Sequence, residues 1–323
     1  MTRPRVIVTR RWPEPVQAAL AERYDVRLNE ADEPFDRSAL ADALGEADAL
    51  CPTVTDRLDA ELLAAPGIRT RLIANIAVGY NNIDVPAAEQ AGIAVTNTPG
   101  VLTDCTADLA MTLLLMTARR AGEGERELRA GAWKHFSPTH LLGRKVTGRT
   151  LGIIGAGRIG LATAARAHFG FGMRILLHSR SPVPESQRRA LGAEQCDLDT
   201  LLARSDFVSL HCPATPETRH LINAATLARM QPHAVLVNTA RGDVVDEPAL
   251  VEALEKQRIG GAGLDVYERE PVVPPGLLDL PNVTLLPHMG SATQETRTAM
   301  GLCAVANLDA FFSGEPLPNR VRG

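Results

Sequence analysis

The chain has 323 residues, which is enough for about two domains of ordinary size. Its 45% hydrophobic and 22% charged residues are typical of a globular protein and exclude a disordered or fibrous one. The formal net charge of −4 gives no basic field for nucleic acid.

The cysteine pattern and the apolar runs indicate the compartment. Five cysteines without CxxC spacing favour a reducing environment, and we expect no metal site. The first apolar run, Val6–Val8, is too short for a signal peptide, and no run reaches the ~18 residues of a membrane span. We therefore expect a cytoplasmic protein that does not enter a membrane.

Residues 5–95 alternate short apolar runs with segments of helical spacing. This alternation predicts a parallel sheet covered by helices, an α/β domain without a phosphate-binding glycine loop. The predicted strands are Val6–Thr9, Val26–Leu28, Ala49–Cys51, Leu72–Ile76 and Ile93–Thr96. The predicted helices are Pro15–Arg23, Ser38–Leu44, Ala60–Ala64 and Pro86–Gln90.

The segment from Val101 to Arg120 is long and largely apolar. Leu109, Leu113 and Met116 recur there at helical spacing, which predicts a helix. Because it is too apolar for a surface helix, we expect it to be buried between domains or at a subunit contact.

Residues 150–180 have the pattern of strand, glycine turn, helix and strand, with Gly155, Gly157 and Gly160 in a GxGxxG spacing. In a dinucleotide-binding unit the first glycine makes a tight turn, the second admits the pyrophosphate, and the third lets the helix pack on the strand. The helix N-terminus favours the anion through unpaired N–H groups and the helix dipole. We predict a nicotinamide dinucleotide cofactor.

The residues after the second strand of this unit favour a phosphorylated cofactor. A carboxylate usually binds the ribose of NAD about 20 positions after the glycine turn, but Ser179, Arg180 and Ser181 stand here instead. A guanidinium and two hydroxyls suit a 2′-phosphate. We predict NADP(H) in preference to NAD(H); in the alternative interpretation, Arg180 is an ordinary surface arginine.

The rest of the chain completes a second, doubly wound sheet. Strands are predicted near Phe207–His211, Val235–Asn238, Gly263–Val266 and Val283–Leu286, with a helix at Asp246–Gln257. A last helix should begin at a capping box, Ser291 to Gln294, and stop at Gly314. The economical arrangement returns this helix to the first domain. We therefore predict two Rossmann-like or flavodoxin-like parallel-sheet α/β domains: a discontinuous substrate domain of residues 1–99 plus 291–323, and a dinucleotide-binding domain of residues 100–290.

Three polar clusters follow the predicted strands of the second domain, and they contain Arg241, Glu270 and His288. Singly, these could be a salt-bridge arginine, a surface carboxylate and a core or capping histidine. Together they supply what the reduction of a 2-oxo acid needs: a proton donor, a carboxylate that keeps the donor protonated, and a cation that orients the substrate. We predict His288 as the general acid, Glu270 as its partner and Arg241 as the cation.

Six motifs in the same order resemble the D-isomer-specific 2-hydroxyacid dehydrogenase family, most closely its glyoxylate/hydroxypyruvate reductases. They are VGYNNID at 78–84, TNTPGVLTDCTADLA at 96–110, GIIGAGRIG at 152–160, NTARGDVVDE at 238–247, GLDVYEREP at 263–271 and LPHMGSAT at 286–293. The resemblance implies reduction of glyoxylate and hydroxypyruvate to glycolate and D-glycerate, and residues 179–181 predict NADPH as the reductant. It also implies an active site in the cleft between the domains and a homodimer.

The resemblance further implies site residues. Arg241, Glu270 and His288 would be catalytic, and the N–H groups of Val78 and Gly79 would bind the substrate carboxylate. The cofactor contacts that the resemblance implies are Thr106, Arg158, Ile159, Pro213, Thr218, Thr239, Ala240, Arg241, Asp265, His288 and Gly290. The residues predicted above from the glycine turn and from the loop after the second strand complete the predicted cofactor site: Gly155, Gly157, Gly160, Ser179, Arg180 and Ser181.

Two departures leave the substrate preference open. His140 stands where the related reductases would have a tryptophan that reaches the partner's pocket, and Thr53-Val54 replaces bulkier side chains. The alternatives are another dehydrogenase of this fold, of the phosphoglycerate, phosphite or formate type, and a nucleotide-sensing binding protein of the corepressor kind. Turnover of small 2-oxo acids would separate the enzymes from the binding protein.

Overall fold

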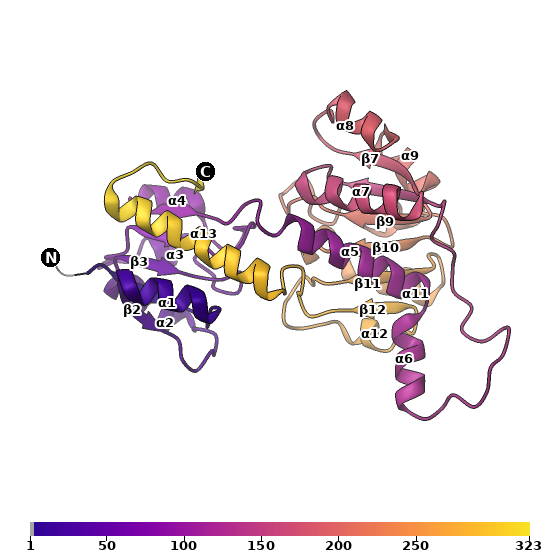
Figure 1. Cartoon of the computed structure of the whole chain (residues 1–323), viewed down its shortest axis with the longest axis horizontal. Coiled ribbons are helices and arrows are strands. Elements are labelled where there is room, and N and C mark those ends of the chain that lie inside the picture. Colours follow the sequence, from indigo (N-terminus) through magenta and orange to yellow (C-terminus); the bar gives the residue numbers. More distant parts are fainter. Residues whose placement is uncertain (1–2) are drawn as a thin grey trace. The chain divides into compact units, whose positions relative to one another are not determined.

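The computed structural model describes residues 3–323, which form two compact units. Unit 1 contains the chain up to Leu102 together with Ser291–Gly323, and unit 2 is Thr103–Gly290 (Figure 1). Each unit has its own sheet of mainly parallel strands with helices packed on it. The predicted fold class of two parallel-sheet α/β domains is confirmed. Among the described residues no helix combines the length and the apolar character that crossing a bilayer requires.

Unit 1 is a six-stranded sheet in the order β13-β5-β4-β3-β1-β2. All neighbouring pairs are parallel except β13 with β5. The strands are β1 (Arg5–Val8), β2 (Asp25–Leu28), β3 (Ala49–Cys51), β4 (Leu72–Ala74), β5 (Ala94–Thr96) and β13 (Arg320–Val321). The helices are α1 (Glu14–Arg23), α2 (Arg37–Glu46), α3 (Ala60–Leu63), α4 (Val85–Gln90) and α13 (Gln294–Ser313).

The central strands of unit 1, β1, β3 and β4, are apolar on both faces because helices cover both. Ile7 and Leu50 pack with α2 and α4 on one face, whereas Val6, Val8 and Ala49 pack on the other. Alternate residues of a strand point to opposite faces, which explains the continuous apolar runs.

Helix α13 lies beside α1 and completes the second of these faces (Figure 1). Thr293 is its N-cap and accepts a hydrogen bond from Thr296 N, so the predicted capping box at Ser291 is wrong by two residues. The predicted stop is confirmed, since Gly314 ends the helix at a φ of +75°.

Unit 2 is a seven-stranded parallel sheet in the order β12-β11-β10-β9-β6-β7-β8. The strand order reverses between β6 and β9, the place where parallel α/β sheets usually bind ligands. The strands are β6 (Thr150–Ile154), β7 (Arg174–His178), β8 (Ala193–Gln195), β9 (Phe207–Leu210), β10 (Val235–Asn238), β11 (Gly261–Leu264) and β12 (Val283–Leu285). The helices are α5 (Thr103–Ala118), α6 (Ala121–Arg129), α7 (Arg158–Phe171), α8 (Glu185–Ala190), α9 (Leu198–Arg204), α10 (Ala224–Leu227), the 3-10 helix η1 (Gly242–Val244), α11 (Glu247–Glu255) and α12 (Pro275–Leu278).

Helix α5 is buried against the sheet of its own unit. Leu113 and Leu114 join the core that β6, β7 and β10 share, and Thr117 Oγ1 donates to Oγ1 of Thr284 in β12 at 3.0 Å. The structure thus buries this helix within its own unit, a packing that the expectation of a place between domains or at a subunit contact did not include. Its apolar character reflects a position over central strands, where neighbouring elements surround it.

Helix α6 and the loop that follows it extend away from the sheet of unit 2 (Figure 1). No residue of α6 is buried. Within residues 128–142, four large apolar side chains are exposed: Leu128, Trp133, Phe136 and Leu142. In the same segment, His140 Nε2 lies 3.0 Å from Glu127 Oε2.

Candidate active site

The glycine turn between β6 and α7 has a backbone that side chains would not fit. Gly155 has a φ of +97°, and a Cβ there would lie 2.5 Å from Cys212 N. A Cβ on Gly160 would lie 2.2 Å from Gly155 O, so the helix approaches the turn closely. These two contacts agree with the roles of a tight turn and close helix packing.

The N-terminus of α7 is open to an anion. Gly157 is the N-cap, no side chain caps the helix, and a Cβ on Gly157 would meet no atom within 4 Å. The first N–H groups of a helix have no partner within the helix. Free N–H groups, the helix dipole and open space fit a diphosphate, so this turn can hold a dinucleotide.

The loop after β7 is organised by a residue that the sequence analysis missed. Gln195 Oε1 accepts from Val183 N at 2.9 Å, and Gln195 Nε2 donates to Ser181 O at 3.2 Å. Ser179 Oγ also donates to Ser181 O, at 2.6 Å. Gln195 lies at the end of β8, a strand too short and polar to be recognised from its sequence.

Arg180 is exposed in this loop, and its charge acts on the loop after β9. The pKa of Glu217 is lowered, first by its hydrogen bond with Thr215 and also by the positive charge of Arg180. In the same loop, Thr218 Oγ1 donates to Pro213 O at 2.6 Å. The structure thus brings the charge of Arg180 near the segment that holds two other predicted cofactor residues.

His288 and Glu270 form a close pair in unit 2. Nδ1 of His288 lies 2.6 Å from Oε2 of Glu270, and the other carboxylate oxygen accepts from Tyr267 N at 3.1 Å. Nε2 of His288 has no hydrogen-bond partner among residues 3–323, and the imidazole is 32% exposed. The pair therefore holds one ring nitrogen and leaves the other for a ligand.

The charges around this pair favour an ionised carboxylate. Burial by itself would raise the pKa of Glu270, but the hydrogen bond and charge of His288, aided by Arg241, outweigh it, and the pKa is lowered. Burial lowers the pKa of Arg241, while the charge of Glu270 opposes that change. A guanidinium remains protonated in proteins, so Arg241 is a fixed cation near the carboxylate.

Asp265 fixes the backbone beside His288. Its two carboxylate oxygens accept from Met289 N at 2.6 Å and Gly290 N at 2.8 Å, and its carbonyl accepts from His288 N at 2.9 Å. Thr106 Oγ1 donates to Gly290 O at 3.0 Å. These bonds hold His288 at a φ of +53°, which non-glycine residues adopt only when the surroundings determine it.

Arg241 lies on a loop that packs against the loop of Glu270. A Cβ on Gly242 would lie 1.9 Å from the carbonyl carbon of Tyr267, so the two backbones are in contact. Asn238 Nδ2 donates to Arg241 O at 2.9 Å, and Asn238 Oδ1 accepts from Ala240 N at 3.0 Å. The sequence analysis did not include Asn238 among the site residues, although its position at the end of β10 was a signal.

Thr239, also on this loop, is 8% exposed, and its Oγ1 has no hydrogen-bond partner among residues 3–323. A buried hydroxyl usually has a partner, so this atom fits a bound cofactor. Thr239, the glycine turn and the N-terminus of α7 belong to unit 2, and all three suit the predicted nicotinamide dinucleotide.

Other histidines of this unit do not fit the role of proton donor. Burial lowers the pKa of His211 to about 3, so its imidazole is neutral near pH 7. His220 Nε2 lies 2.5 Å from Glu268 Oε1, which occupies the nitrogen that a substrate would need. No group of three or more His, Cys, Asp and Glu side chains in residues 3–323 is arranged to bind a metal.

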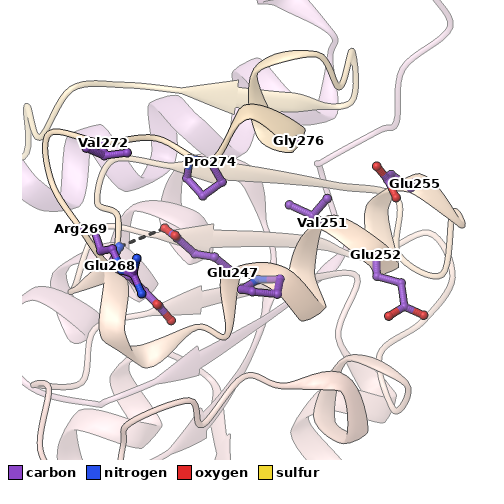
Figure 2. A pocket seen from close by; sticks show the side chains of 10 residues that line it. Glu247, Val251, Glu252, Glu255, Glu268, Arg269, Val272, Pro274 and Gly276 are labelled. Carbon is purple, nitrogen blue, oxygen red and sulfur yellow. Dashed lines mark hydrogen bonds between the residues drawn. The ribbon is translucent and has the colours of Figure 1, made fainter.

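A pocket of about 560 Å³ lies between α11 and residues 268–276 (Figure 2). Glu247 projects from its wall, and its carboxylate accepts the backbone N–H of Glu268 at 3.0 Å. Glu247, Glu252, Glu255 and Glu268 line it with a single cation, Arg269. An anionic 2-oxo acid would be repelled there, so the pocket does not compete with the His288 cluster as the substrate site.

Residues 111–290 match the family model of the D-isomer specific 2-hydroxyacid dehydrogenase NAD binding domain. The chain belongs to the D-isomer specific 2-hydroxyacid dehydrogenase family. It is 48% identical to the glyoxylate reductase of Thermococcus litoralis over 324 aligned positions, which cover 99% of this chain and 97% of the relative.

Solved structures of this family have the same fold. A glyoxylate reductase from Paecilomyes thermophila has a TM-score of 0.86 at 36% identity, with 99% of each chain covered. An NADPH-dependent glyoxylate/hydroxypyruvate reductase from Sinorhizobium meliloti, in complex with NADP and malonate, has a TM-score of 0.86 at 37% identity. That alignment covers 99% of this chain and 97% of the relative. The protein is an NAD(P)-dependent D-2-hydroxyacid dehydrogenase that acts on small acids.

Proposed function

We propose that this dehydrogenase uses NADPH to reduce glyoxylate and hydroxypyruvate to glycolate and D-glycerate. The observation that carries the proposal is the His288 and Glu270 pair, with a free Nε2 and the guanidinium of Arg241 near the carboxylate. The names of the two glyoxylate reductases and of the glyoxylate/hydroxypyruvate reductase support this substrate class.

In the proposed reaction, His288 protonated at Nε2 donates its proton to the carbonyl oxygen of the 2-oxo acid. A reduced nicotinamide, when bound by residues 100–290, would supply the hydride to the carbonyl carbon. Glu270 stabilises the imidazolium before transfer through its bond to Nδ1. Arg241 orients the acid and stabilises negative charge on the oxygen as it develops. The product gains one C–H and one O–H bond, and His288 is left neutral.

The proposal also assigns roles to the two parts of the chain. Residues 100–290 bind the cofactor through the glycine turn, the loop of Ser179–Ser181, the segment of Pro213 and Thr218, and the residues near Thr239 and Asp265. Residues 1–99 and 291–323 bind the substrate, with the N–H groups of Val78 and Gly79 as donors to its carboxylate. The exposed Arg180, with no carboxylate beside it in sequence, supports NADPH over NADH.

A panel of small 2-oxo acids, each assayed with both reduced cofactors, tests this function. We expect oxidation of NADPH with glyoxylate and hydroxypyruvate, and a kcat/KM for NADPH on the order of tenfold or more above that for NADH, because one charge-assisted hydrogen bond is worth about that factor. Oxidation of 3-phosphoglycerate, phosphite and formate with each oxidised cofactor serves as the comparison.

Three results of this panel would contradict the proposal in different ways. Equal use of NADH would remove the argument from Arg180. A preference for 3-phosphoglycerate, phosphite or formate would support the sibling dehydrogenases. No turnover with any of these acids would favour a nucleotide-sensing binding protein.

We further propose that residues 128–142 form a homodimer contact. Phe136 is 81% exposed, and Leu128, Trp133 and Leu142 of the same segment are exposed as well, which favours an interaction surface. Phe136→Glu should convert a dimer to a monomer, so that the mass measured by light scattering falls from about twice 34.6 kDa to that of one chain. Phe169, which is 71% exposed on α7, provides the control, and Phe169→Glu should leave the dimer intact. A wild-type protein that is monomeric at micromolar concentration would refute the contact.

A further inference from the structure

The loop between β4 and α4 turns its carbonyl groups into unit 1. Four consecutive carbonyls accept hydrogen bonds: Ala77 O from Thr98 N at 2.9 Å, Val78 O from Asn97 Nδ2 at 2.8 Å, Gly79 O from Asn75 Nδ2 at 3.0 Å, and Tyr80 O from Ile83 N at 3.0 Å. The N–H groups of Val78 and Gly79 donate to nothing within residues 3–323. Both residues are partly exposed, so a ligand can reach them.

The bonded carbonyls determine where the free N–H groups point. A peptide unit is planar and trans, so the C=O of one residue and the N–H of the next point in opposite directions. Thr98 N, by binding Ala77 O, orients the N–H of Val78. Asn97, by binding Val78 O, orients the N–H of Gly79. Asn97 is thus the side chain that sets the direction of one of the two donors.

A peptide that precedes glycine needs such a restraint. Glycine adopts positive and negative φ with similar ease, so the Val78–Gly79 peptide could rotate at little cost if its carbonyl were free. Asn97 is itself held: it follows β5, the parallel neighbour of β4, and its backbone N–H donates to Asn319 O at 3.2 Å. The two neighbouring strands therefore place a fixed amide opposite the carbonyl.

We propose that Asn97 is a positioning residue, which holds the Val78–Gly79 peptide so that the N–H of Gly79 donates to the carboxylate of the 2-oxo acid. This inference rests on the proposed function. Asn75 supports the next peptide in the same way, but it is fully buried and its Oδ1 has no hydrogen-bond partner within residues 3–323. Asn97 is partly exposed and is the better residue to change.

Two variants test the proposal, Asn97→Ala and Asn97→Asp. Asn97→Ala should raise the KM for glyoxylate about tenfold, the effect of about one lost hydrogen bond. It should change kcat less than about threefold and leave the dissociation constant of NADPH unchanged. The inhibition constant of oxamate, a carboxylate that is not reduced, should rise together with KM. Asn97→Asp keeps the shape but sets a carboxylate against Val78 O, so its KM should rise further.

Asn29→Ala is the matched control in the same unit. Asn29 Nδ2 donates to two loop carbonyls, Thr9 O at 2.7 Å and Glu33 O at 2.6 Å, but not to the loop of Val78. Its KM for glyoxylate should equal that of the wild type, whatever its melting temperature. A lower melting temperature or kcat with an unchanged KM in both Asn97 variants would show a merely structural role and overturn the inference alone. A wild-type enzyme inactive with every 2-oxo acid would instead overturn the proposed function.

Discussion

His288→Ala should lower kcat for glyoxylate reduction by about 10²–10⁴-fold, the usual contribution of a general acid. Nδ1 of the imidazole is bound to Glu270, and Nε2 has no partner within residues 3–323, so one nitrogen is left for the carbonyl oxygen. The dissociation constant of NADPH, measured by fluorescence titration, should change little. Steady-state and single-turnover kinetics check the loss in the chemical step.

His220 offers a matched control for this variant. Its Nε2 also pairs with a glutamate, Glu268, and its side chain is similarly exposed, at 33%. His220→Ala should keep kcat within about threefold of the wild type. A loss of less than tenfold in His288→Ala would assign the proton transfer to another group.

Glu270→Gln adds a pH dependence to the same prediction. The pKa of Glu270 lies below its ordinary value, so the carboxylate stays ionised at neutral pH. The ionised carboxylate therefore stabilises the imidazolium at any pH above the ordinary pKa of a glutamate. This stabilisation is lost only as the pH falls through the lowered pKa of Glu270. Gln removes the stabilisation at every pH, so the basic limb of the kcat/KM profile for reduction should move to lower pH. An unmoved basic limb would contradict a role for Glu270 in holding the proton.

Ser179→Asp with Arg180→Ala should reverse the cofactor preference. The double change removes a guanidinium and adds a carboxylate where we place the 2′-phosphate, so kcat/KM for NADPH should fall by on the order of 10²-fold or more. The value for NADH should stay within a few-fold, because its ribose carries a hydroxyl that a carboxylate can bind. Initial rates with each cofactor at saturating glyoxylate measure both values.

Arg189→Ala is the control for a general effect of surface charge. Arg189 lies on α8 after the same loop, with a side chain that is 79% exposed and paired with Glu185. It should leave the ratio of the two cofactors unchanged. An equal fall in kcat/KM for NADPH and NADH in the double variant would mean that Arg180 does not bind the 2′-phosphate.

The strands could be predicted because each central strand is buried on both faces and therefore appears as an apolar run. Ala49–Cys51 and Val235–Asn238 have the predicted bounds. The polar residues after β10, β11 and β12 pointed to the candidate site, since the carboxyl ends of parallel strands meet at one edge. The sequence predicted which residue types cooperate, whereas only the structure gives the 2.6 Å between His288 and Glu270.

The contacts that depend on long-range register could not be predicted. Strand β13 has two residues and no apolar run, and its pairing of Arg320 with Thr96 joins segments far apart in the chain. Gln195 and Asn97 are ordinary polar residues in sequence, and their roles follow from the loops that neighbouring strands place beside them. The packing of α5 on the sheet of its own unit could not be predicted for the same reason, because apolar composition indicates that a helix is buried but not against which elements.

The discontinuous first unit constrains the order of events during synthesis. The segment up to Leu102 leaves the ribosome before the rest of unit 1, because α13, which covers α1, and β13, which pairs with β5, are translated only after unit 2. The continuous second unit has all its strands before those segments emerge. One apolar face of the N-terminal segment of unit 1 therefore stays uncovered during synthesis until residues 291–323 leave the exit tunnel.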